Sequence, residues 1–146
     1  EVDYGFVGDL DEDSVNTQTL ASLLNARLVP VLSAITHDGD SQLLNTNADT
    51  ITSQVAVGMS ELYETSIYYC FELNGVLKDI NDKNSVIKNI NSESYPALLS
   101  DGIIADGMLP KLENCFDALK NGVHAVFMGN TTILTKENEN YTKITL

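Results

Sequence analysis

Apolar residues recur along the chain at helical spacing in three stretches, and each stretch has a residue suited to begin or end a helix. The stripes are Leu20, Leu23, Leu24 and Arg27 behind a cap at Asn16; Ile51, Val55, Met59 and Leu62 behind a cap at Asn47; and Leu112, Cys115, Phe116 and Leu119 ahead of Asn121-Gly122. A fourth, shorter helix is predicted over residues 92–100, capped by Ser92 and interrupted by Pro96.

Short apolar or β-branched runs between these stripes predict strands. They cover residues 4–10, 28–33, 65–72, 86–90 and 124–128, and a terminal hairpin is predicted from residues 131–136 and 141–146. The runs at 28–33 and 65–72 are expected to be buried, the second on both faces. Strands that alternate with amphipathic helices predict an α/β sandwich with a largely parallel sheet.

Composition narrows the classes of function. The 146 residues suit one domain, and 8 Lys+Arg against 21 Asp+Glu give a net charge of −13. Because nucleic-acid binding needs clustered positive charge, we expect no nucleic-acid partner. No apolar run is long enough for a membrane span and no leader is visible, so we expect a cytoplasmic protein without membrane contact. Cys70 and Cys115 are expected to be buried free thiols.

Ligands of α/β sheets bind where strands end and helices begin, and three such places carry polar groups. They are residues 45–49 (NTNAD), 71–77 (FELNGVL) and 103–111 (IIADGMLPK). In the first, Asn45, Asn47 and Asp49 suit a ligand that has both an amide and a carboxylate. The simpler interpretation is that Asn47 caps the helix and Asp49 favours its dipole.

Lys111 is the one lysine that lies in the first turn of a predicted helix. A cation at the N-terminus of a helix destabilises that helix by about 0.3–1 kcal/mol. A ligand phosphate or a carboxylate such as Asp49 close to the ammonium would explain why a lysine stands there. A solvated surface lysine is the alternative. A tight turn is the simpler explanation of Asn74-Gly75. His37 and His124 have no neighbours in sequence that would form a catalytic triad, so we expect ordinary surface or core roles for them.

Together these segments resemble the acylglutamate kinases of the amino acid kinase family. The matching stretches are GFVGDL, VPVLSAI, SQLLNTNADT, FELNGVLKD and GIIADGMLPKLENCFDALKNGV, in the family's order and spacing. The resemblance implies a three-layer αβα sandwich with a mainly parallel sheet, incomplete at its N-terminal side. Residues 1–64 would be the rest of the amino acid half, and residues 65–146 the nucleotide half.

The resemblance also implies an activity: transfer of the γ-phosphoryl group of ATP, with Mg²⁺, to the side-chain carboxylate of an N-acylated glutamate in arginine biosynthesis. Asn45 and Asn47 match substrate-binding positions, Asp49 the aspartate that orients lysines, and Lys111 the lysine that stabilises the phosphoryl group. The nucleotide-binding positions would be Glu72, Leu73, Asn74, Gly75, Val76, Leu77, Ile103, Ile104, Ala105, Gly107 and Met108. Phe71-Glu72 departs from the small hydroxyl residue and aspartate usual in the family.

The family's Lys-x-Gly-Gly strand, glycine-rich loop and substrate-binding arginine have no counterpart here, and we expect them upstream of Glu1. This chain alone is therefore expected to be weak or inactive as a kinase. The resemblance implies a homodimer, with a hexamer as the alternative. A kinase for aspartate, carbamate or uridylate is one alternative, which Asn45 within QLLNTNAD opposes. A non-catalytic binding or regulatory paralogue is the other.

Overall fold

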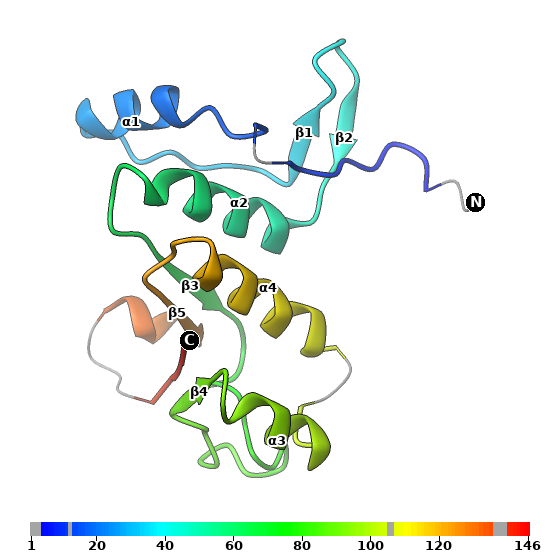
Figure 1. The fold of residues 1–146 in the computed structure, drawn as a ribbon, viewed down its shortest axis with the longest axis vertical. Coiled ribbons are helices and arrows are strands. Elements are labelled where there is room, and N and C mark those ends of the chain that lie inside the picture. Colours follow the sequence, from blue (N-terminus) through cyan, green and yellow to red (C-terminus); the bar gives the residue numbers. More distant parts are fainter. Residues whose placement is uncertain (1–3, 12, 105–106, 136–139) are drawn as a thin grey trace.

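The computed structural model describes residues 4–11, 13–104, 107–135 and 140–146 (Figure 1). The elements, in chain order, are α1 (Thr17–Asn25), β1 (Ile35–His37), β2 (Leu43–Asn45), α2 (Ala48–Ser60), β3 (Ser66–Cys70), β4 (Asn89–Asn91), α3 (Tyr95–Ser100), α4 (Leu109–Lys120), β5 (Ala125–Gly129), the 3₁₀ helix η1 (Thr131–Leu134) and β6 (Thr142–Thr145).

The main sheet has four strands in the order β3-β5-β6-β4. The pairs β3–β5 and β4–β6 are parallel, and β5–β6 is antiparallel. A separate antiparallel hairpin joins β1 and β2. The predicted α/β class is confirmed, and the sheet is mixed because β6 enters beside β5 in the opposite direction.

Helices α2 and α4 lie side by side over one face of this sheet (Figure 1). In β3, Ile67 and Tyr69 are buried on that face, whereas Ser66, Tyr68 and Cys70 on the other face are exposed. The expectation that this strand is buried on both faces was therefore wrong. On the exposed face Tyr68 stacks on a neighbouring ring, that of Phe127, with 4.7 Å between ring centroids.

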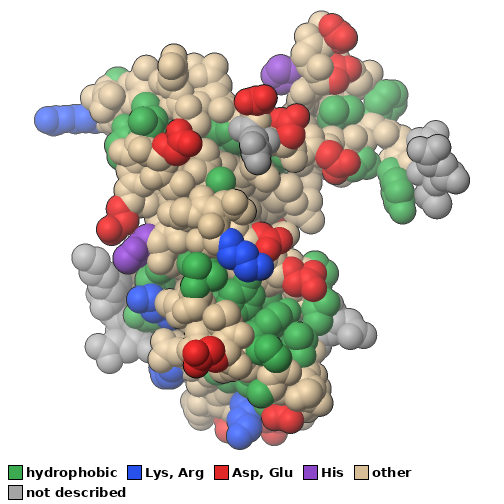
Figure 2. All heavy atoms as spheres, in the orientation of Figure 1, with side chains coloured by type: hydrophobic (Ala, Val, Ile, Leu, Met, Phe, Trp, Pro, Cys, Tyr) green, Lys and Arg blue, Asp and Glu red, His purple; other side chains and the backbone are tan. Residues whose placement is uncertain are grey.

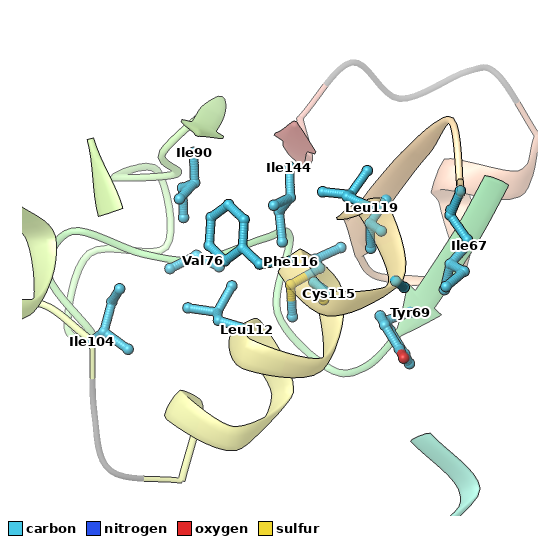
Figure 3. Packing of buried hydrophobic residues seen from close by; sticks show 14 residues of the cluster. Ile67, Tyr69, Val76, Ile90, Ile104, Leu112, Cys115, Phe116, Leu119 and Ile144 are labelled. Carbon is cyan, nitrogen blue, oxygen red and sulfur yellow. The ribbon is translucent and has the colours of Figure 1, made fainter. Parts of the chain in front are cut away.

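The main hydrophobic core cluster lies within residues 67–144 (Figure 3). Its buried members are Ile67, Tyr69, Val76, Ile90, Ile104, Leu112, Cys115, Phe116, Ala118, Leu119, Val123, Val126, Met128 and Ile144. They come from the four strands of the main sheet, from α4 and from the connections between them. This core therefore fixes α4 against the sheet, and α2 packs against its edge through Ala56 and Val57.

The first part of the chain buries far fewer of its hydrophobic side chains. The chain exposes 9831 Å², whereas a compact monomer of its mass is expected to expose about 7,300 Å². Residues 28–33 form no strand, and Val29 and Val31 are 86% and 92% exposed, so the prediction of a buried strand there was wrong. Residues 4–10 contribute only an isolated bridge between Val7 and Asn45. Figure 2 shows hydrophobic side chains on the surface near β1 and β2.

Local signals placed most of the helices correctly. Asn16 caps α1 by accepting from Thr19 N. Helix α4 ends at Lys120, with Asn121 as its C-cap and Gly122 next, at φ 101°. The short helix predicted over residues 92–100 is α3, which begins at Tyr95 and is not capped by Ser92. The predicted terminal hairpin is absent from the described residues: Asn130 accepts from Thr132 N and begins η1 instead, and β6 lies between β5 and β4. Residues 136–139 lie outside the described part of the chain.

No helix within the described ranges is long and apolar enough to cross a membrane.

Thr142 ties β6 to the segment that follows β3. Its buried hydroxyl accepts a hydrogen bond from Val76 N at 2.8 Å and donates one to Ile87 O at 2.7 Å. Thr142→Val keeps the shape but leaves these buried groups without that partner. We expect it to lower the free energy of unfolding by about 1–3 kcal/mol, measured by urea denaturation. Thr145→Val, half-buried in the same strand, is the control, and equal midpoints for the two variants would contradict the role of the hydroxyl.

Candidate functional site

The first side of the candidate site is the start of α2. Asn45 ends β2 with its side chain exposed. Asn47 caps the helix, since its Oδ1 accepts from Asp49 N at 2.8 Å and from Thr50 N at 3.3 Å. The capping interpretation of Asn47 is thus confirmed, and its proposed contact with substrate stays a prediction. Asp49 follows in the first turn, where its negative charge suits the helix dipole.

The second side is the start of α4, and it meets the first. Lys111 is the third residue of α4, and its Nζ lies 2.5 Å from Oδ2 of Asp49. The side chains are 26% and 31% exposed, so the pair lies at the surface of the protein but is partly shielded from water. The structure therefore brings together the two residues that the sequence singled out in separate segments.

The two helices run parallel, so their N-termini share one end of the molecule. Asp49 and Lys111 connect the two starts, and near the other end Ser60 Oγ lies 3.5 Å from Asn121 O. Parallel helices present their positive ends and unpaired N–H groups together. An anion at this end would meet both helix ends and the Lys111 ammonium, which is the arrangement that phosphate groups favour.

Tyr69 underlies this ion pair, although its position in the sequence indicated no role in a site. Lys111 Nζ lies over its ring, 4.7 Å from the centroid. Its hydroxyl donates to the backbone oxygen of Asp49 at 3.3 Å and shares a hydrogen bond of 3.1 Å with Ser53 Oγ. Burial raises the pKa of Tyr69 to about 12, so the phenol stays protonated at neutral pH. The available signal was its alternate position in β3, on the face that α2 and α4 cover.

Residues 72–77, predicted to contact the nucleotide, follow β3 and are partly committed to the fold. Val76 and Leu77 are buried, and Asn74 Oδ1 accepts from Asn130 Nδ2 at 2.6 Å. Gly75 does not have a positive φ, and a Cβ there would lie 2.6 Å from Thr142 Oγ1. Close packing rather than a tight turn therefore explains this glycine. Glu72 is exposed and Leu73 half-buried.

The other predicted nucleotide segment leads into α4. Ile103 is half-buried, Ile104 belongs to the core, and Ala105 lies outside the described residues. Gly107 is exposed, and Met108, directly before α4, packs against the core. Contact of these segments with a nucleotide stays a prediction.

Comparison with known proteins identifies the family of this site. The model of the amino acid kinase family matches residues 3–130. The chain belongs to the amino acid kinase family. The acetylglutamate kinase of Cytophaga hutchinsonii is 46% identical over 142 residues, which are 97% of this chain and 53% of that protein. That of Phocaeicola vulgatus is 48% identical over 126 residues, 86% of this chain and 48% of that protein. The chain spans about half the length of the curated relatives it matches.

Solved structures agree with an amino acid kinase fold. Carbamate kinase from Giardia lamblia superimposes with a TM-score of 0.65 at 13% identity, over 90% of this chain and 49% of that one. At that identity the likeness shows the fold alone. It supports the arrangement of sheet and helices that places α2 beside α4.

Cys115 and Cys70 differ in environment, which corrects the expectation that both are buried. Cys70 is exposed, whereas Cys115 is buried one turn beyond Lys111 (Figure 3). Burial raises the pKa of the Cys115 thiol from 9.0 to about 12; Lys111 opposes this shift.

We expect Ellman's reagent at about pH 8 to titrate one thiol in the native chain and two in denaturant. The thiolate reacts, and Cys115 is protonated at that pH. Cys70→Ser should abolish the native reaction; a native reaction that remains would contradict the burial of Cys115.

The raised pKa of Cys115 also predicts how stability depends on pH. Since the pKa of this thiol is higher in the folded than in the unfolded chain, unfolding releases the thiol proton between about pH 9 and 12, and the chain should lose stability as the pH rises through that window.

Proposed function

We propose that this chain carries part of the active site of an acylglutamate kinase, which transfers the γ-phosphoryl group of ATP to the side-chain carboxylate of an N-acylated L-glutamate in arginine biosynthesis. The observation that carries the proposal is the Asp49–Lys111 pair at the adjoining N-termini of α2 and α4. The identity of 46% to an acetylglutamate kinase over nearly the whole chain supports the same activity.

The proposed reaction needs no general base at this site. A glutamate side chain is already ionised at neutral pH, so the attacking carboxylate needs no proton removed. Phosphoryl transfer then depends on alignment of two anions and on stabilisation of the charge that moves between them. Lys111 would supply that positive charge, and Asp49 would hold the ammonium in a fixed place.

Asn45 would bind the N-acylated glutamate and so select this substrate. Asn45 is exposed at the end of β2, three residues before Ala48, the first residue of α2. An amide both donates and accepts hydrogen bonds, so it can bind the N-acyl group and a carboxylate of the same substrate.

The residues present fit the phosphate groups of ATP, because an ammonium and two helix N-termini converge. Among the described residues no group of three or more His, Cys, Asp or Glu side chains could hold a metal ion. Mg²⁺ is commonly bound through substrate phosphates and water with few carboxylates, so it would arrive with ATP. When bound, it neutralises part of the phosphate charge.

The activity is tested on the gene product with N-acetylglutamate and N-succinylglutamate as separate substrates. ADP release reports turnover, and capture of the product by hydroxylamine as a hydroxamate identifies a carboxylate as the acceptor. Turnover with aspartate, carbamate or uridylate alone would overturn the choice of substrate. Saturable binding of an acylglutamate without turnover would indicate the non-catalytic paralogue.

Lys111→Ala in the gene product should lower kcat by about 10²–10³-fold, because a charge that stabilises the transferring group is lost. The ion pair is partly exposed, so the free energy of unfolding should fall by no more than about 1 kcal/mol. Lys120→Ala is the matched control, since Lys120 ends the same helix and is 64% exposed beside Asp117. A purified Lys111→Ala protein with near-normal kcat would contradict the catalytic role.

A further inference from the structure

Tyr69 touches both members of the ion pair, through different parts of its side chain. The ring face lies under Lys111 Nζ, and the hydroxyl binds the backbone oxygen of Asp49 and the side chain of Ser53. Since Asp49 and Ser53 lie one turn apart in α2, the hydroxyl fixes the first turn of that helix. One residue of β3 thus fixes the starts of both helices relative to the sheet.

The ring face limits where the ammonium can go. A lysine has a flexible stem and a compact charge, so a carboxylate alone attracts the ammonium without fixing the direction of approach. An aromatic face attracts a cation along the ring normal, and more strongly where water is reduced. Tyr69 is 7% exposed and belongs to the core, so its own position is fixed by packing. Figure 3 shows it at the edge of the cluster with its hydroxyl pointing away from the other core side chains.

We propose that Tyr69 is a positioning residue, whose ring holds the Lys111 ammonium in place for the transferring phosphoryl group and whose hydroxyl sets the part of α2 that carries Asp49. The effect on catalysis rests on the proposed function. The effect on the ammonium does not, because it concerns contacts within this chain alone.

Two substitutions separate the two parts of the side chain. Tyr69→Phe keeps the ring and removes the hydroxyl. Tyr69→Leu keeps apolar volume in the core and removes the ring. Tyr68→Leu is the matched control, because Tyr68 is the adjacent residue of β3, points to the opposite face and stacks on Phe127.

The first measurement is an NMR spectrum of this chain and needs no activity. Protons over an aromatic ring face resonate upfield, so the ε-methylene protons of Lys111 should lie upfield of those of other lysines. Tyr69→Phe and Tyr68→Leu should keep this shift, and Tyr69→Leu should abolish it. An ordinary shift in the unmodified chain would overturn the proposal even if Tyr69→Leu did not fold.

The second measurement is the kinetics of the gene product. Tyr69→Leu should lower kcat about tenfold, the size expected when a partly buried cation–π contact is lost, and should change KM for ATP and for the acid little. Tyr69→Phe should keep most of the kcat of the unmodified enzyme, because the ring remains. Tyr68→Leu should have the same kcat as the unmodified enzyme. A purely structural role would predict the same kcat for all folded variants, and that result would overturn the proposal.

The two measurements also separate this inference from the proposed function. If the upfield shift depends on the Tyr69 ring but neither acylglutamate is phosphorylated, the position of the ammonium is supported and the proposed function fails. If an acylglutamate is phosphorylated and Tyr69→Leu retains both kcat and the upfield shift, the proposed function stands and the role of Tyr69 is wrong.

Discussion

The ion pair between Asp49 and Lys111 is the interaction on which the arrangement of the candidate site depends. It joins side chains 62 residues apart and sets the N-terminus of α2 against that of α4. Each residue alone has a different effect on its helix: the carboxylate favours the first turn of α2, whereas the ammonium disfavours the first turn of α4. The carboxylate that α2 supplies offsets the unfavourable charge at the start of α4, so neither helix start is independent of the other.

Much of the fold could be predicted wherever the deciding signal is local. Asn16 and Asn47 cap their helices, and Gly122 follows α4, because a cap needs only its own neighbours in sequence. Burial of a strand depends instead on what covers it. Residues 28–33 have the composition of a buried strand but no pairing strand among the described residues. The side chains on one face of β3 are exposed, and Tyr68 there stacks on the ring of Phe127. Composition could not show either outcome.

The candidate site was predictable to the same extent. Asp49 and Lys111 stood out because both lie at helix starts in segments that resemble one family, and the structure brings them together. Tyr69 did not stand out, since an aromatic residue in a strand is ordinary and its importance comes from what packs over its ring. Val76 matched a nucleotide segment in sequence, yet its N–H binds Thr142 inside the protein. A local motif does not show which of its groups the fold has already used.

Among the described residues, β3 is one of the two edge strands of the main sheet, and it carries Tyr69 beneath the ion pair. An outermost strand offers a row of backbone amides and carbonyls to any extended polypeptide that reaches it. The residue that contacts both members of the ion pair therefore belongs to a strand whose free backbone edge can pair with an added strand.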